Sequence, residues 1–430
     1  MNLSRGSRNC GLGMGDGGCG PLIFAFYLLF SVLCSLASAG KYGGGSGTAE
    51  NPFLIYTTED FITMSNTPSD WDKSFKLMRD IDLSGYDERN FRAIGRWFGL
   101  GVLENKPFSG TLDGNGRTIS NFRYKDVHQE YVGLFSYVTG VITNLELVQA
   151  TVIGDASGTG ALVGYLERGG VRQCSASRVY VSGNLCVGGL VGLADSGLGK
   201  CSVRGQVSGI SYVGGLVGQC GKGTLFQSYS KATVVGNDSV GGLAGAIMND
   251  NAVVDSCYAS GGVDGSQYVG GLVGQVVQGT LFRCYSTGPV AGKSNVGGFV
   301  GSLRVLGKSL GSFWDTEASR QATSPGSQGK TTAEMRTMDT YLASNWDFIN
   351  VWTICDGINY PVLLWQIPRG DLVCPDGVDW VDFVWFARNW RHNDCVELNS
   401  SCEGADLDSS GSVEYPDLAI FAETWLDGMD

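Results

Sequence analysis

Over most of the chain, short apolar runs of valine, leucine and tyrosine alternate with glycine, serine, asparagine and aspartate. The phrase VGGLVG at 213–218 is representative, because it places apolar residues at its first and fourth positions with glycines between them. Such runs are typical of strands separated by turns, and a 3.6-residue apolar period is almost missing from this region. The pattern therefore predicts a mainly β protein.

The glycine-rich phrase recurs at a nearly constant spacing. Its copies begin 26 to 29 residues apart, at 131, 159, 187, 213, 240, 269 and 296. A fixed period of this size indicates stacked structural units, none of which can bury its apolar face alone. We therefore expect a parallel β-solenoid (β-helix) with one repeat of about 27 residues per coil.

In such a solenoid, the valine and leucine of each phrase, for example Val213 and Leu216, would point inward and stack on their equivalents. The glycines would permit positive φ and close backbone approach at a corner. A glycine-rich loop can also hold phosphate, but that use needs a strand–loop–helix context, usually with Lys and Ser or Thr. No copy opens a predicted helix, so a structural role is favoured.

A second phrase, which begins about 14 residues after the first, carries a cysteine or a serine at a fixed place. These residues form a predicted column: Cys174, Cys201, Ser228, Cys257 and Cys284. Free cysteine behaves as a small buried hydrophobe, which favours an interior ladder. Disulfides within the column and a metal site are the alternatives, although parallel Cβ vectors suit disulfides poorly and a one-sided column does not surround an ion.

The recurring phrases at 131–301 resemble the GLUG repeat family, named for its Gly-Leu-hydrophobic-Gly core. The resemblance implies an exported or surface protein, and the family includes bacterial proteases that cleave immunoglobulin A through a separate zinc domain. The only histidines of this chain are His128 and His392, and an HExxH motif is missing. The protease activity is therefore not carried over.

The segments around the repeats divide the chain further. Residues 40–130 are predicted to form a cap and the first coils, and residues 302–368 a second cap with a helix over KTTAEMRTMDTYLAS. Residues 1–39 combine Arg5 and Arg8 with an apolar run that ends in Ala37-Ser38-Ala39, which is typical of a cleaved signal peptide. A membrane anchor is the alternative. We expect a secreted or cell-surface protein whose mature chain has no membrane span.

The C-terminal region is strongly acidic. Residues 371–430 hold 14 of the 42 acidic residues and 2 of the 30 basic ones, so this region alone carries the net charge of −12. The rest of the chain balances, and nothing in it is basic enough to indicate nucleic-acid binding. An acidic segment of this kind is either a solvated surface or a cation site.

The spacing within DLDSSGSVEYPD at 406–417 favours a calcium loop. Such loops place oxygen ligands at positions 1, 3, 5, 7, 9 and 12, with glycine at position 6 for the sharp turn. The expected ligands are Asp406, Asp408, Ser410, the carbonyl group of Ser412, Glu414 and Asp417, with Gly411 at the turn. Aspartate at position 12 departs from the ordinary EF-hand, which has glutamate there.

The same pattern occurs 35 residues earlier, where Val378, Asp382 and Phe386 match Val413, Asp417 and Phe421. This duplication over 369–430 resembles a dockerin module, whose two calcium-loop–helix halves pack as a pair and dock onto a cohesin partner. The resemblance implies calcium as the cofactor and a cohesin-like or cell-surface protein as the partner. The first loop departs from the pattern, because Val373 occupies a ligand position; its weaker candidate ligands are Asp371, Asp376, Asp379 and Asp382. The cysteines nearby suggest two disulfides, Cys395–Cys402 and Cys355–Cys374.

Two classes of function remain. The favoured one is a non-catalytic binding or structural protein, with a glycan among the candidate ligands of the solenoid. The alternative is a polysaccharide lyase or glycoside hydrolase attached to a cohesin-type scaffold. Catalysis of that kind needs carboxylates gathered on one face. Those between 151 and 302 do not recur in register, so no catalytic residue is assigned; Trp97, Phe98 and Trp314 could line a sugar site or pack in a core.

Overall fold

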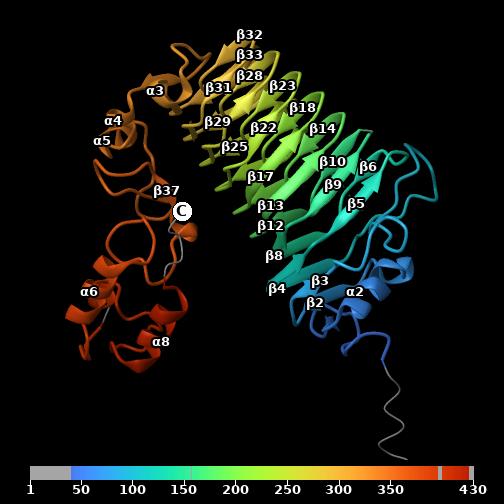
Figure 1. Cartoon of the computed structure of the whole chain (residues 1–430), viewed down its shortest axis with the longest axis horizontal. Helices are drawn as coiled ribbons and strands as arrows, with labels where there is room; N and C mark the ends of the chain where they lie inside the picture. Colours follow the sequence, from blue (N-terminus) through green and yellow to red (C-terminus); the bar gives the residue numbers. More distant parts are fainter. Residues whose placement is uncertain (1–39, 156, 396–399, 426–430) are drawn as a thin grey trace, which may run out of the picture.

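The computed structural model describes residues 40–155, 157–395 and 400–425, without the side chains of Ser400 and Ser401. The predicted signal peptide lies outside these residues. The main body is a parallel β-solenoid of about seven turns, which confirms the predicted fold class. After the last coil the chain turns back along one side of the solenoid and ends in a small helical module (Figure 1).

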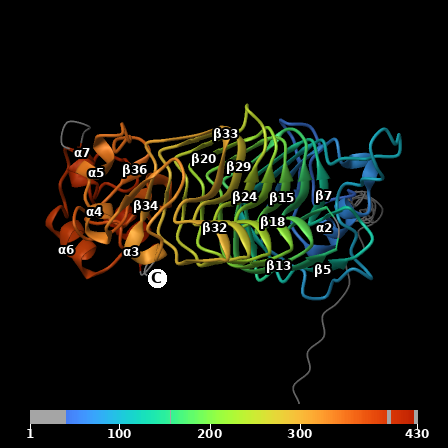
Figure 2. The same cartoon turned by 90° about the horizontal axis from the view of Figure 1, so that it is seen from above.

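One face of the solenoid is a seven-stranded parallel sheet, which Figure 2 shows from above. Each coil adds one strand to it. Its strands are β6 (Tyr131–Val132), β10 (Gly158–Gly160), β14 (Leu185–Gly188), β18 (Ser211–Gly214), β23 (Asp238–Gly241), β28 (Gln267–Gly270) and β32 (Ser294–Gly297).

The other faces belong to one continuous 28-stranded sheet that bends around the coil. Directly after the first face come β7 (Phe135–Val138), β11 (Val163–Leu166), β15 (Val191–Ala194), β19 (Val217–Cys220), β24 (Ala244–Ile247), β29 (Val273–Phe282) and β33 (Val300–Leu310). The next face holds β4 (Thr111–Ser120), β8 (Val141–Val148), β12 (Gly170–Arg172), β16 (Gly197–Gly199), β20 (Thr224–Phe226) and β25 (Val253–Asp255), and it continues into β29 and β33.

The last face closes each coil. Its strands are β3 (Ile81–Asp82), β5 (Arg123–Asp126), β9 (Thr151–Gly154), β13 (Ser175–Ser182), β17 (Ser202–Ser208), β21 (Tyr229–Ser230), β22 (Thr233–Val235), β26 (Tyr258–Ala259), β27 (Val263–Asp264), β30 (Tyr285–Ser286), β31 (Val290–Ala291), β34 (Phe313–Asp315) and β35 (Gln328–Lys330).

Equivalent residues of successive coils pair in register. Val213 pairs with Val187 on one side and Val240 on the other, and all three are fully buried, as is Leu216. Stacking like residues on like buries a continuous apolar core that no single coil could form. The predicted inward placement of the valine and leucine is therefore correct.

The glycines of the repeated phrase allow close approach, as predicted, but they do not adopt positive φ, so that part of the prediction is wrong. A Cβ atom on Gly214 would lie 2.0 Å from the carbonyl oxygen of Val217, and one on Gly245 would lie 2.3 Å from the carbonyl carbon of Tyr212. The left-handed conformation instead falls on the residue before each VGG, for example Tyr212 at φ 54°. The glycines thus allow the backbones of two sheets to touch.

The cysteine column is an interior ladder, as predicted. Cys174, Cys201, Cys257 and Cys284 are free and buried, and Ser228 fills the remaining place. The side chain of each column residue faces the carbonyl group two residues earlier in its own coil, as between Ser228 Oγ and Phe226 at 2.9 Å. Between coils, the Cys257 amide donates to Cys284 Sγ at 3.4 Å, so the column satisfies polar backbone groups at the turn.

The N-terminal end is closed by an apolar cap. Strands β1 (Phe53–Ile55) and β2 (Ser74–Leu77) extend the sheet, and helix α2 (Thr58–Ser65) and the 3₁₀ turn η1 (Pro68–Asp70) cover the first coil. Thr57 begins α2 with a capping box that includes Asp60. The fully buried Trp71 donates from its indole nitrogen to the Met64 carbonyl oxygen at 2.9 Å, which fixes this cap to the coil.

Residues 331–367, here called the strap, run back along the solenoid. The strap contains α4 (Thr332–Met335), α5 (Asp339–Leu342), β36 (Trp352–Thr353), β37 (Val362–Leu363) and η2 (Leu364–Gln366), and the short α3 (Thr316–Ser319) precedes it. The expected helix is split into α4 and α5, and Thr331 is the N-cap of α4. The Met338 amide donates to Asp356 at 2.7 Å instead of continuing the helix.

The strap covers a column of aromatic rings on the outside of the solenoid, here called the tyrosine stack: Tyr229, Tyr258 and Tyr285. Neighbouring rings are parallel, with centroids 4.9 Å apart at both steps. Trp365 and Trp352 of the strap pack on these rings at 5.7 to 6.3 Å. Because Tyr258 and Tyr285 are only 2% exposed, the strap closes a second apolar core beside the main one.

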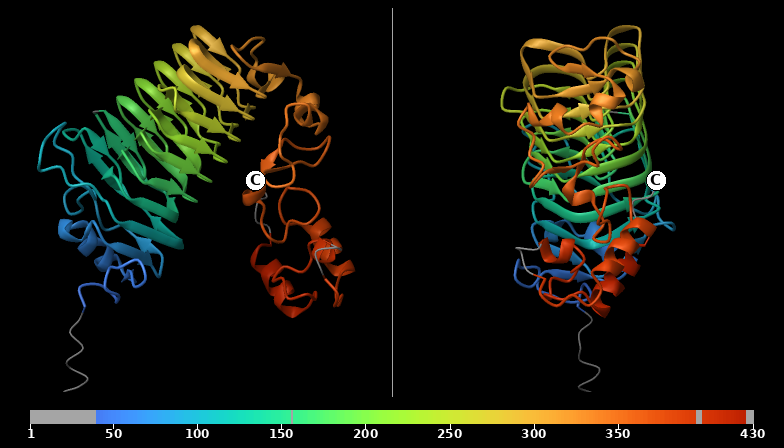
Figure 3. Two further views of the ribbon diagram at one scale, coloured as in Figure 1. Left: turned by 180° about the vertical axis from the view of Figure 1, so that it is seen from behind. Right: turned by 90° about the vertical axis from the view of Figure 1, so that its left-hand side faces the viewer.

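The C-terminal module has three helices within the described residues: α6 (Trp380–Arg388), α7 (Ser400–Glu403) and α8 (Tyr415–Glu423). Both suggested disulfides are present, with Cα–Cα distances of 5.3 Å for Cys355–Cys374 and 4.9 Å for Cys395–Cys402. The first links the module to the strap. Figure 3 shows the module beside the solenoid in two further views. No helix among the described residues is long and apolar enough to cross a bilayer.

Candidate calcium loops and a surface cavity

The second loop brings three of its predicted ligands together. Carboxylate oxygens of Asp406, Asp408 and Asp417 lie within 4.8 Å of one another. Asp406 is 7% exposed and Asp417 is fully buried, whereas Asp408 is exposed. Two buried carboxylates beside a third repel one another in a medium of low dielectric constant, which a divalent cation would relieve.

Backbone amides shape this loop around its carboxylates. Asp406 accepts from the amides of Ser410 and Gly411, each at 3.0 Å, and Gly411 has φ 93° as the sharp turn requires. Asp417 accepts from the amides of Asp408 at 3.0 Å and Glu414 at 2.9 Å. The Ser410 hydroxyl and amide hold the pKa of Asp408 below its usual value, so that this carboxyl is ionised near neutral pH.

The remaining predicted ligands line the loop as a hydrogen-bonded chain. The hydroxyl of Ser410 donates to the carbonyl oxygen of Ser412 at 3.2 Å, and the hydroxyl of Ser412 donates to Glu414 at 2.8 Å. Glu414 also begins α8 as its N-cap, with Asp417 completing the capping box. The loop therefore has a local structural role besides any role as a ligand set.

The first loop repeats this geometry despite its altered sequence. The Gly377 amide donates to Asp371 at 3.1 Å and the Asp379 amide donates to Asp382 at 2.9 Å. These contacts match those of Asp406 and Asp417 in the second loop. The two halves also meet in the module core, where the rings of Phe386 and Phe421 stack at 5.1 Å.

Asp371 has the local environment of an incomplete cation site. Its Oδ1 is buried and has no hydrogen-bond partner among the described residues. Burial raises the pKa of Asp371 to about 7, and the negative charges of Asp382, Asp376 and Asp379 add to the shift. Burial and the charges of Asp379 and Asp382 also raise the pKa of Asp376. Hard oxygen donors of this kind suit Ca²⁺. Among the described residues only the second loop brings three carboxylates within 4.8 Å of one another, so its residues fit the ion, whereas no three of the first-loop candidates gather in this way.

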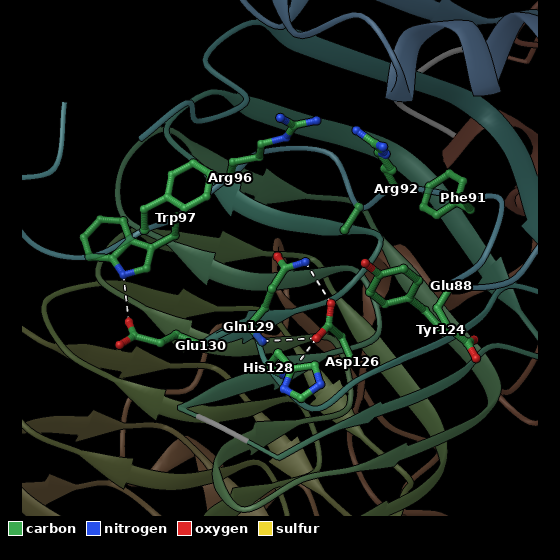
Figure 4. A pocket seen from close by; sticks show the side chains of 12 residues that line it. Glu88, Phe91, Arg92, Arg96, Trp97, Tyr124, Asp126, His128, Gln129 and Glu130 are labelled. Atoms are coloured by element: carbon green, nitrogen blue, oxygen red, sulfur yellow. Dashed lines mark hydrogen bonds between the residues drawn. The ribbon is translucent and has the colours of Figure 1, made fainter. Parts of the chain in front are cut away.

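A separate cavity of about 700 Å³ lies near the N-terminal end of the solenoid (Figure 4). Trp97 and Phe98 line it, as the sequence suggested for a sugar site, whereas Trp314 does not; it is buried in the main core with 4% exposure. Arginine and glutamate side chains share the lining with these two rings. Sequence reasoning missed Arg92, Arg96 and Glu130, which carry no spacing signal and meet only in the folded coils.

One carboxylate of this cavity is committed to the local fold. Asp126 accepts from the amides of His128 and Gln129 and from the Gln129 side chain, at 2.8 to 3.1 Å, so it holds a turn. Glu88 lies beside Tyr124, and Glu130 lies across the cavity beside Trp97 (Figure 4). A retaining or inverting glycosidase needs two carboxyl groups that face one bond.

Comparisons with known proteins find similarity over part of the chain. The chain is 32% identical over 224 residues to the protein named "Halomucin" of Haloquadratum walsbyi, which covers 51% of this chain and 2% of that protein. It is 32% identical over 147 residues to a "Putative Gly-rich membrane protein" of Evansella cellulosilytica, or 33% of this chain and 16% of that protein. The chain thus spans a small part of each relative, and no family model matches it.

Two solved structures show partial likeness. One is titled as that of a "putative immunoglobulin A1 protease" from Bacteroides ovatus, with a TM-score of 0.46 and 22% identity over 76% of this chain and 96% of that one. The other, "IgA1 Protease", has a TM-score of 0.42 and 16% identity over 70% of this chain and 25% of that one. Both scores are low, so the fold assignment rests on the strand pairing described above.

Proposed function

We propose that this chain is an exported, non-catalytic binding protein. Its β-solenoid is a rigid platform, and its C-terminal module is stabilised by Ca²⁺ and attaches the platform to a partner protein at the cell surface. The observation that carries the proposal is the pairing of two equivalent acidic loops, one of which gathers the oxygens of Asp406, Asp408 and Asp417 within 4.8 Å.

The bound ion would complete each loop by balancing carboxylates that the fold holds together. Asp406, Asp408 and Asp417 would coordinate it in the second loop, and Asp371 and Asp382 would do so in the first. Backbone amides already orient the carboxylates of Asp406 and Asp417, so binding would cost little reorganisation. The attachment role and a cohesin-like partner rest on the resemblance to dockerin modules.

Calorimetric titration of the full chain with CaCl₂ tests the proposal. We expect Ca²⁺ binding that Asp408→Asn weakens by about tenfold or more, because the exposed carboxylate is a ligand whose loss removes charge from the site. Asparagine can keep the acceptor for the Ser410 amide, so the loop fold is preserved. The exposed Glu423→Gln, in the last turn of α8, is the matched control and should bind normally. Equal binding by Asp408→Asn and the unaltered chain would refute the ligand assignment.

A polysaccharide-degrading enzyme is the competing function. Three carboxylates and a histidine line the cavity near Trp97. These residue types can serve in acid–base catalysis. The commitment of Asp126 to its turn argues against it. Release of reducing sugar from any polysaccharide by the purified chain would overturn the non-catalytic proposal.

A further inference from the structure

Other residues hold the wall of the cavity near the N-terminal end of the solenoid in place. Its wall at Trp97 is fixed by three tyrosine rings from the first two coils: Tyr131, Tyr137 and Tyr165 lie edge-on to the indole at 5.0 to 5.9 Å. The Trp97 indole nitrogen donates to Glu130 at 2.7 Å. A side chain held by four contacts before any ligand arrives loses little entropy when one binds.

The same rings are anchored by carboxylates on the next coil. The hydroxyl of Tyr137 donates to Glu167, and that of Tyr165 donates to Asp195 at 3.0 Å. These bonds keep the aromatic surface rigid and keep the phenols protonated, since burial and the paired carboxylates raise the pKa of both tyrosines. The wall of the cavity is therefore positioned by three successive coils.

The lining of the cavity combines a flat apolar surface with hydrogen-bonding groups of both kinds. Phe98 is 59% exposed and offers a ring to solvent. Arg92 and Arg96 lie close together on the opposite side from Gln129 (Figure 4), and Arg96 stacks over the buried Trp71 at 6.0 Å. Guanidinium groups offer several donors in a fixed plane, and carboxylates such as Glu130 offer only acceptors.

The charges of this lining nearly cancel, because two arginines face three carboxylates. A polyanion or a polycation would meet as much repulsion as attraction there. An uncharged ligand with adjacent hydroxyl groups can instead accept from arginine and donate to carboxylate at once. Its apolar C–H face would pack on an aromatic ring, as in other mixed polar and aromatic pockets.

We propose that this cavity is a binding site for an uncharged oligosaccharide, with Phe98 as the stacking platform, Arg92 and Arg96 as donors and Glu130 as an acceptor. This assignment rests on the proposed function of the chain as a binding protein. It adds the place of the ligand site and the chemical class of the ligand. A volume of about 700 Å³ suits a short oligosaccharide rather than a single small ion.

The test is calorimetric titration of the full chain with neutral oligosaccharides of glucose, xylose, mannose and galactose. The oligosaccharide that binds most tightly is then titrated into variants of the chain. We expect Phe98→Ala and Arg92→Ala each to raise the Kd by about tenfold, corresponding to about 1.4 kcal/mol. Both side chains are exposed, so neither change should unfold the chain. Tyr180→Ala, at a 41% exposed aromatic ring on β13, and Arg117→Ala, at an exposed arginine on β4, are the matched controls and should bind like the unaltered chain.

Three results would overturn the assignment. These are no binding of any neutral oligosaccharide, binding only of acidic oligosaccharides such as oligogalacturonate, or undiminished binding by both Phe98→Ala and Arg92→Ala. None of these results bears on calcium binding by the C-terminal module, which the titration of Asp408→Asn tests. Cleavage of the bound saccharide would instead refute the non-catalytic function while leaving the site in place, so the two failures can be told apart.

Discussion

At the scale of single residues, burial protects the thiol groups of the cysteine ladder from reaction. The cysteines of the ladder are enclosed by neighbouring coils, and burial raises the pKa of Cys201 to about 12. The thiolate, which is the nucleophile, is thus almost unpopulated near neutral pH. This explains how the chain carries several free cysteines without forming disulfides among them.

We therefore expect the folded chain to resist alkylation at the ladder. At pH 8, Cys201 should react with iodoacetamide more than about a hundredfold slower than a peptide thiol, because both its thiolate fraction and its access are low. Peptide mapping by mass spectrometry would report each position separately. Denaturation in guanidinium should restore full labelling, and rapid labelling of Cys201 in the folded chain would contradict the ladder.

At the scale of elements, each strand is held less by its own propensity than by the coil on either side. Glycine at the corner is required because two backbones meet there, as at Gly245 and the backbone of Tyr212 and Val213. A methyl group at this position has no space, and the neighbouring atoms belong to backbone that cannot move aside. The same lack of space explains why glycine recurs at this position in successive coils.

Gly245→Ala should destabilise the solenoid by about 3 kcal/mol or prevent its folding, since overpacking against backbone cannot be relieved by a rotamer change. Gly85→Ala is the control, because a Cβ atom there meets nothing within 4 Å. Denaturant unfolding followed by circular dichroism would compare the two. Equal midpoints for both variants would show that the corner tolerates a side chain.

The strap depends on the tyrosine stack in a comparable way. Tyr258→Ala removes a ring that lies between two others, along with the acceptor of the Gln366 side chain at 2.8 Å, and large-to-small changes of this kind cost about 3–5 kcal/mol. We expect the strap to become susceptible to trypsin within 331–367. The Tyr180→Ala control should leave the cleavage pattern unchanged. An unchanged cleavage pattern in Tyr258→Ala would show that the other contacts of the strap are enough to hold it.

Sequence alone predicted the elements that repeat and missed those that do not. The valine, leucine and cysteine columns followed from the period, because stacked coils place like residues together. The strap could not be predicted, since its contacts join Trp365 to Gln227 across 138 positions of sequence and follow no period. The acidic loops were recognised from ligand spacing. Of the cavity, only Trp97 and Phe98 were suggested, because Arg92 and Glu130 belong to different turns of the chain.

At the scale of the whole molecule, a solenoid and a small helical module with cores of different kinds are joined in one chain. The solenoid is stabilised by stacking of coils, and the C-terminal module by a small aromatic core, the Cys395–Cys402 disulfide and, in our proposal, calcium. Small domains of this size commonly need such cross-links or metals. The two parts should therefore respond differently to metal removal.

We expect two thermal transitions in calorimetry, only one of which depends on calcium. Adding Ca²⁺ at a hundred times its Kd should stabilise the module by about 2.7 kcal/mol and leave the solenoid transition unchanged. Excess EDTA should reverse the shift, and Mg²⁺ at the same concentration should have a smaller effect because it demands a stricter octahedral site. An equal upward shift of both transitions would contradict a metal site confined to the module.

The tyrosine stack also has a consequence for how the length of this protein can change. A solenoid is easily extended by copying one coil, and nothing in its own stacking limits the number of copies. Here each covered coil contributes one ring, and the strap meets these rings with tryptophans at fixed intervals. An inserted coil would shift every later ring past its partner. The strap therefore limits the number of coils that it covers, and we infer that duplication of a coil is not tolerated between 229 and 313.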